Sequence, residues 1–239
     1  MFAIFRRFWI HLACVVVALG FWETPFVKPF RVFVVLVHEM GHAGMALATG
    51  GEVVEMRVQW QEAGHMQSRG GFFPAISSAG YVGSAVLGAL LIYVGNWMRI
   101  QRILLGLIGG TTVGMTVLYT PPWGIDFVFG VVSGAILLVL VLRFPQAAWI
   151  VAAWMGMMLC LYSLYDFKTD LWMQTEQTDA GILARYLGFP VLAYPIAFCW
   201  AAVSIVVMYL ALRGVVRHEL QIVDHEGQSD AVLESEDPN

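Results

Sequence analysis

Long apolar segments are the feature that most restricts how this chain can fold. The apolar core of a bilayer is about 30 Å thick, and a helix needs about 20 residues to cross it. About seven segments of this length, or nearly so, follow one another along the sequence. They are residues 8–22, 30–48, 75–97, 103–119, 127–144, 147–165 and 189–212. We therefore expect an all-α polytopic membrane protein with about six or seven transmembrane helices.

The composition agrees with a chain whose surface faces lipid. Hydrophobic residues make up 59% of the sequence and charged residues only 13%, and the mean hydropathy is +0.72. A soluble globular domain carries about twice this share of charge. A single soluble core cannot bury so much apolar surface. We therefore expect an integral, multi-pass protein of the lipid bilayer. The location that we expect for it is the cell (inner) membrane of a bacterium.

The polar residues at the two ends suggest the limits of the membrane domain. Arg6 and Arg7 precede the first apolar segment, which we interpret as an uncleaved helix; a cleaved signal peptide is the alternative. Residues 214–239 are polar and acidic, a composition typical of a disordered tail. The transmembrane domain is then residues 1–213. No basic patch with interleaved aromatic residues occurs, so nothing in the sequence supports nucleic-acid binding.

One segment, residues 52–69, departs from the helical pattern. Apolar and polar residues alternate there between two glycine pairs, Gly50-Gly51 and Gly70-Gly71, with Gly64 in between. This alternation around a glycine-containing turn predicts a small β-hairpin. A two-stranded sheet is only marginally stable alone, so we expect it to lie against the helix bundle or the membrane surface.

The positive charges give an expected orientation. They are nearly balanced between the two faces of the membrane, but Arg6 and Arg7 ahead of the first helix favour a cytoplasmic N-terminus. With about seven spans, the hairpin and the loops at residues 121–125 and 166–188 would also be cytoplasmic. The acidic tail would lie outside.

The second apolar segment contains the sequence His38-Glu39-Met40-Gly41-His42, an HExxH motif. Residues four apart lie on one face of a helix, so both imidazoles can bind one metal ion, and zinc suits imidazole ligands. Glu39 lies one residue off that face, where it can take a proton from a water that the metal activates. Ionisable residues inside an apolar helix are costly and mark functional sites. The motif therefore predicts a zinc metalloprotease with Glu39 as its catalytic residue.

Two other interpretations of the histidines stay open. In the first, they only satisfy hydrogen bonds within a polar patch of the bundle. In the second, His11 of the first apolar segment and one motif histidine bind haem from two helices. The haem interpretation leaves Glu39 without a role.

Further motifs follow in order along the chain. Residues 37–51 read VHEMGHAGMALATGG, and later segments read RGG at 69–71, AGYVGS at 79–84, LYSLYD at 161–166 and TDA at 178–180. Together they resemble the site-2 protease family of intramembrane zinc metallopeptidases, and most of all its B-like branch. The resemblance covers about residues 30–200 and implies cleavage of membrane-protein substrates. A catalytically silent scaffold or regulator of the same fold is the alternative.

The resemblance also implies which residues act. A catalytic zinc would be held by His38, His42 and an Asp from a separate helix. Asp166, at the end of an apolar segment, is the first candidate, and Asp179 and Asp126 are the alternates. For each Asp, the other interpretation is a loop or helix-cap carboxylate at the membrane edge. The resemblance further suggests that the hairpin presents an extended substrate to the zinc by strand addition.

Overall fold

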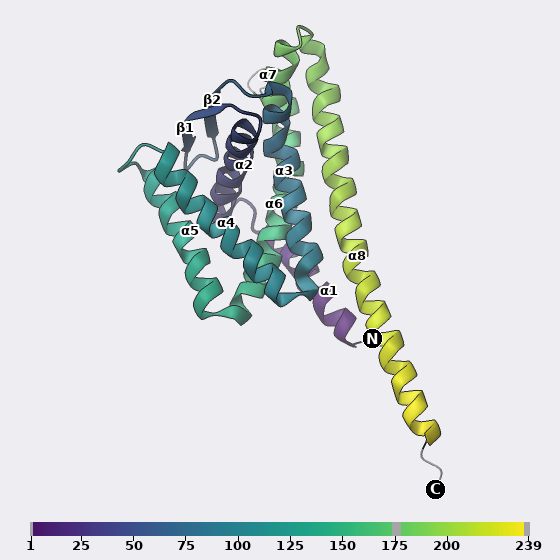
Figure 1. The fold of residues 1–239 in the computed structure, drawn as a ribbon. Helices are drawn as coiled ribbons and strands as arrows, with labels where there is room; N and C mark the ends of the chain where they lie inside the picture. Colours follow the sequence, from purple (N-terminus) through teal and green to yellow (C-terminus); the bar gives the residue numbers. More distant parts are fainter. Residues whose placement is uncertain (1, 174–177, 237–239) are drawn as a thin grey trace.

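The structure is a computed structural model that describes residues 2–173 and 178–236. Within these residues the chain forms a bundle of helices with one two-stranded sheet at its upper end (Figure 1). The helices are α1 (Phe2–Gly20), α2 (Lys28–Ala48), α3 (Phe73–Tyr93), α4 (Met98–Tyr119), α5 (Ile125–Arg143), α6 (Pro145–Met173), α7 (Asp179–Tyr186) and α8 (Ala193–Glu236), with short 3-10 helices at Val94–Asn96 and Pro190–Leu192.

In the described part of the chain, 6 helical segments are long and apolar enough to cross a membrane. They are α2, α3, α4, α5, Pro145–Tyr162 of α6, and Pro190–Arg217, which includes the first half of α8. The expected class, an all-α polytopic protein with a small hairpin, is confirmed. Each apolar segment of the sequence forms a helix. The first of them forms α1, which is not among these candidate spans.

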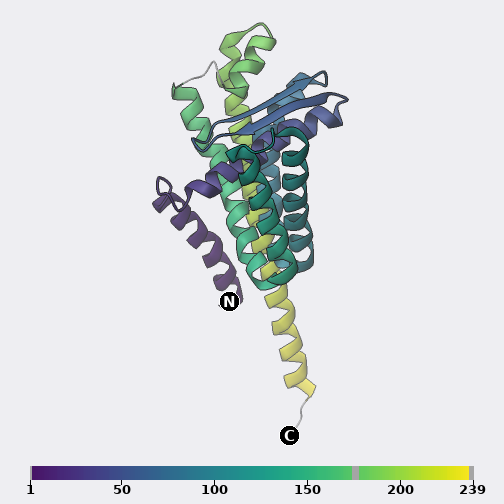
Figure 2. The same ribbon diagram turned by 90° about the vertical axis from the view of Figure 1, so that its left-hand side faces the viewer.

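The two ends of the bundle carry different parts of the chain (Figures 1 and 2). The hairpin, the α4–α5 loop and α7 lie at the upper end, and α8 runs down past the lower end. The hairpin and the C-terminus are therefore on opposite sides, as expected. The N-terminus, however, also lies at the lower end, so the prediction that it shares a side with the hairpin is wrong. The reason is visible in both views: α1 and α2 rise one after the other toward the hairpin, instead of forming an antiparallel pair.

The last helix continues into the acidic tail. α8 runs as one helix to Glu236, and the disorder predicted for residues 214–239 stays a prediction. The segment from 215 to 226 contains neither Gly nor Pro. A helix that is already formed in the membrane extends without the cost of a new nucleus. The helix can therefore continue past residue 214, although the residues there have the composition of a solvated segment.

The strands β1 (Glu52–Val58) and β2 (Gly64–Arg69) form the predicted antiparallel hairpin. β1 turns Val53, Met56 and Val58 into the interior, where the strand lies beside α2 and α4. β2 has no buried residue. β1 therefore attaches the hairpin to the bundle, and β2 is the outer strand.

A buried ion pair fixes the hairpin turn to the first half of α2. Arg31 is 5% exposed, and its Nη2 donates to Oε1 of Glu62 at 3.0 Å. Glu62 has a left-handed backbone, with a φ of 68°. Burial raises the pKa of the Glu62 carboxyl, and Arg31 and Lys28 oppose this shift without cancelling it. The ion pair thus offsets only part of the cost of burying the carboxylate.

We expect Arg31→Met to destabilise the protein by about 2 kcal/mol, because it leaves the Glu62 carboxylate buried without its cation. Adding Glu62→Gln should restore most of this loss, since the neutral pair needs no compensating charge. Arg57 is the control: its side chain is 43% exposed, and Arg57→Met should cost less than about 1 kcal/mol. Thermal unfolding of the full chain in detergent measures all three. An Arg31→Met protein as stable as the wild type would contradict this role of the ion pair.

Candidate metal centre

The two histidines of the HExxH motif lie one turn apart on α2 and point the same way. Their Nε2 atoms are 2.9 Å apart, and His38 and His42 are only 9% and 5% exposed. The helix that carries them has clear local signals. It begins with Pro29 in its first turn, where the missing N–H costs no helical hydrogen bond, and it ends before Gly50, whose φ is 80°.

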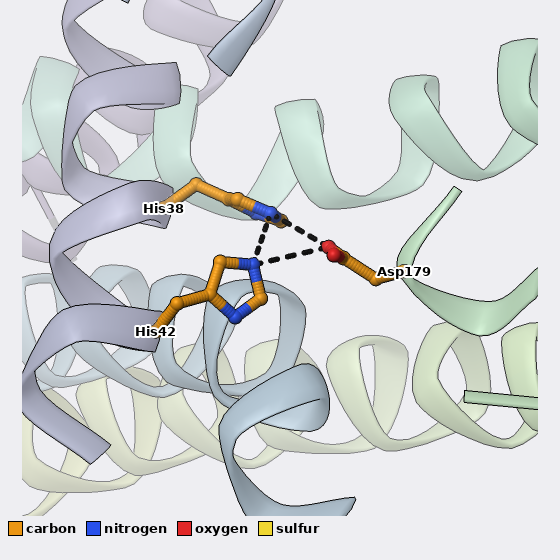
Figure 3. Close-up of side chains that lie close together, drawn as sticks. All are labelled: His38, His42 and Asp179. Atoms are coloured by element: carbon orange, nitrogen blue, oxygen red, sulfur yellow. Dashed lines mark hydrogen bonds and ion pairs between the residues drawn. The ribbon is translucent and has the colours of Figure 1, made fainter. Parts of the chain in front are cut away.

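Asp179 completes the group from a distant part of the chain (Figure 3). Its Oδ2 lies 3.0 Å from Nε2 of His38 and 3.1 Å from Nε2 of His42. Asp179 is the first residue of α7, and Thr178 caps this helix by accepting a hydrogen bond from the N–H of Gly181 at 3.0 Å. Burial raises the pKa of the Asp179 carboxyl, but the two imidazoles outweigh burial and hold this pKa below its ordinary value.

The hydrogen bond that Nδ1 of His42 makes determines the tautomer of the ring, and therefore what its Nε2 can bind. The Nδ1 of His42 lies 2.6 Å from the carbonyl oxygen of Ile76. A carbonyl only accepts hydrogen bonds, so Nδ1 must carry a proton, and in the neutral ring Nε2 then holds a lone pair. This lone pair faces the Asp179 carboxylate, which is also an acceptor. Only a second proton or a cation between the two atoms resolves this contact.

The donor set fits a zinc ion. The ligand atoms of His38, His42 and Asp179 all lie within 4.8 Å of one another, a grouping that could hold a metal ion. Tetrahedral zinc with bonds of about 2.0–2.1 Å places neighbouring ligand atoms about 3.3 Å apart, close to the 2.9–3.1 Å seen here. Two imidazoles and one carboxylate leave the fourth position open, as catalytic zinc sites require.

A glycine lets α3 approach the histidines directly. A Cβ on Gly80 would lie 2.5 Å from Nε2 of His38 and would also overlap the His42 ring. On α2, directly before His42, a Cβ on Gly41 would lie 2.6 Å from the carbonyl oxygen of Ala79 on α3. These two glycines let α2 and α3 pack backbone to backbone. Any side chain at position 80 would fill the space in which a bound ion must sit.

Glu39 points to another neighbour, the hairpin. A Cβ on Gly64, the first residue of β2, would lie 2.7 Å from the Cδ of Glu39, and Glu39 is only 7% exposed. The histidines face α3 and α7, whereas the carboxylate of Glu39 lies under the start of β2. The motif thus separates metal binding from proton transfer. The two histidines share one face of α2, and Glu39, the acid–base candidate, lies beside that face.

The other residues singled out in the sequence lie elsewhere or outside the described side chains. Asp126 is not brought to the group: its Oδ2 accepts a hydrogen bond from Nη1 of Arg57 at 3.3 Å, in the first turn of α5. Asp166, the first candidate for the third ligand, lies in α6, but its side chain is outside the described part of the structure, as is that of His11. His65 is exposed in β2.

Sequence reasoning missed the residues that support the ligands. Gly80 lies inside the AGYVGS segment, so the resemblance marked its neighbourhood without assigning it a role. Gly64 was interpreted as a turn residue, but the left-handed backbone of the turn belongs to Glu62. The contact of Gly64 with Glu39 explains the glycine instead. The bond from His42 to Ile76 leaves no signal in the sequence, because any residue supplies a carbonyl.

Comparison with known proteins gives one match. The sequence model of the family described as Peptidase M50B-like matches residues 11–211. None of the curated proteins or solved structures that were compared matches the chain. The matched range contains α2, the hairpin, α3 and α7, and therefore every residue of the candidate centre. It confirms the family resemblance of the sequence motifs.

We expect Gly80→Ala to empty the centre, because the added methyl group would overlap both imidazoles. Gly83→Ala is the matched control on the same helix, since a Cβ there meets nothing within 4 Å. Elemental analysis of both purified variants for divalent metals measures the effect. Gly83→Ala should keep the wild-type metal content. A Gly80→Ala protein that also kept it would show that the ion, if any, binds somewhere else.

Proposed function

Because the chain belongs to the Peptidase M50B-like family, which is the site-2 protease family, we propose that it is an intramembrane zinc metalloprotease. The observation that carries this proposal is the convergence of three metal-ligating side chains, in which Nε2 of His42 and the Asp179 carboxylate lie 3.1 Å apart and need a proton or a cation between them. We assign His38, His42 and Asp179 as the zinc ligands. The substrates are membrane proteins, and the site of action is the cell (inner) membrane of a bacterium.

The residues of the chain divide the reaction between them. When bound, zinc would polarise the scissile carbonyl and make a water more acidic. The Glu39 carboxylate takes a proton from the attacking water and delivers it to the nitrogen of the leaving amine. Ile76 holds the ring of His42 in the tautomer that presents Nε2 to the metal. Burial of the group keeps bulk water away from these charges.

The hairpin supports a mode of substrate binding. A membrane helix must unwind before its amides can be cut, because its carbonyls are otherwise hydrogen-bonded within the helix. The described residues place no further strand beside β2, and β2 begins at Gly64, against Glu39. An unwound substrate segment could pair with this free edge and pass the catalytic carboxylate.

We expect Glu39→Gln to keep zinc and lose proteolysis, since glutamine preserves the shape of the side chain but cannot take a proton. The test compares membranes of cells that express the full chain or this variant, and mass spectrometry counts new peptide ends in membrane proteins. Cleavages present with the wild type should be absent with Glu39→Gln and with a zinc chelator. A variant that cleaves normally would refute the protease proposal. Wild-type protein that binds zinc but makes no cleavage would favour the scaffold, and a haem absorption band would favour the haem protein.

The strand-addition mode predicts that deletion of residues 54–67 abolishes cleavage. The deletion removes the pairing edge and leaves the ligands on α2 and α7 in place. Zinc content and thermal unfolding of the purified variant show whether the rest of the bundle is intact. Full cleavage by a zinc-loaded deletion variant would contradict the role of the hairpin.

A further inference from the structure

Asp179 reaches the centre from a short element. α7 has 8 residues, too few to be a stable helix alone, and Asp179 stands at its first position. The placement of the carboxylate therefore depends on contacts between α7 and the rest of the bundle. Those contacts come mainly from α3 and α8.

Apolar packing supplies one part of this placement. Ala180 and Leu183 of α7 are buried with Tyr81 of α3 and Trp200 of α8. The Tyr81 and Trp200 rings stack with centroids 5.4 Å apart, and Tyr81 also meets the His38 ring edge to face at 4.8 Å. Such packing holds α7 on the bundle, but it is not directional. It therefore does not fix the position of the Asp179 carboxylate relative to the two imidazoles precisely enough for metal binding.

A hydrogen bond supplies the directional part. The hydroxyl of Ser77 on α3 donates to the main-chain carbonyl of Asp179 at 3.0 Å, and Ser77 is only 4% exposed. The adjacent Ser78 forms the hydrogen bond that is common for a serine inside a helix. Its hydroxyl donates to the carbonyl oxygen of Pro74, four residues earlier in the same helix, at 2.8 Å. Ser77 instead joins two elements that are far apart in the sequence.

Ser77 belongs to a short stretch of α3 that contacts every proposed ligand. Ile76 accepts the hydrogen bond from His42, Gly80 leaves room for both imidazoles, and Tyr81 packs on His38. Within this stretch, Ser77 contributes the hydrogen bond that joins α3 directly to the main chain of Asp179. α3 thus acts as a template on which α2 and α7 are brought together.

We propose that Ser77 is a positioning residue that sets the reach of Asp179 to the metal, through its hydrogen bond to the Asp179 main chain. This inference rests on the proposed zinc site. Outer partners of metal ligands typically change metal affinity by about 10–100-fold when they are removed. Ser77 acts one step further away, on the backbone of the ligand, so the lower end of this range applies.

The test measures zinc affinity of the full chain in detergent, by competition with a chromophoric chelator. Ser77→Ala should weaken zinc binding about 10-fold, and Ser77→Thr, which keeps the hydroxyl, should restore it. Ser78→Ala is the matched control and should bind zinc like the wild type. The thermal unfolding of metal-free Ser77→Ala should lie close to that of metal-free wild type, because the substitution removes a single neutral hydrogen bond while the apolar packing of α7 remains. If Ser77→Ala fails to fold, Ser77→Cys, a weaker donor, should show a smaller loss of affinity.

Each outcome separates this inference from the function proposed above. Unchanged affinity in Ser77→Ala, or the same loss in Ser77→Thr as in Ser77→Ala, would overturn the role of the hydroxyl and leave the zinc site standing. Asp179→Ala should lose the zinc and Asp166→Ala should keep it; the reverse result would overturn both the ligand assignment and the inference. Wild-type protein that binds no zinc would refute the proposed function itself.

Discussion

Three side chains that converge on one point constrain the rest of this structure: the buried imidazoles of His38 and His42 and the partly exposed carboxylate of Asp179. Two imidazoles and a carboxylate converge in a bundle made mostly of apolar side chains, where an uncompensated charge is costly. The bond from His42 to Ile76 removes the option of a simple neutral contact with Asp179. A second proton on His42 or a bound cation resolves the arrangement, and the neighbouring elements leave room for an ion. The glycine at position 80 keeps α3 close without filling the space.

The centre also explains why the hairpin lies where it does. The ligand face of α2 is covered by α3 and α7, so Glu39, one residue further along, turns toward β2. Gly64 allows the strand to start directly on the carboxylate, and the pair between Arg31 and Glu62 holds the turn that leads into Gly64. The strand with the free edge is thus fixed at its first residue relative to the catalytic motif, which is the geometry that a substrate-presenting strand needs.

Local patterns in the sequence predicted the parts of the fold that local physics determines. The apolar segments became helices, the alternation at residues 52–69 became the hairpin, and the i, i+4 spacing brought His38 and His42 together. The third member of the group was not determined in this way. Asp179 lies 137 residues from His42 and 141 residues from His38, and no local pattern in the sequence selected it over Asp126 and Asp166. Only the packing of α7 on α3, through Ser77 and Tyr81, distinguishes Asp179. One further prediction failed because it treated segments separately: α1 rises in the same direction as α2.

X-ray absorption at the zinc edge of the purified full chain tests the central claim most directly, because it reports the atoms bound to the metal. The account predicts one zinc per chain with two imidazoles and additional oxygen ligands at about 2.0–2.1 Å. It also predicts loss of the imidazole signal when His38 and His42 are both replaced by alanine. Protein free of zinc, or a spectrum dominated by sulfur at about 2.3 Å, would contradict it.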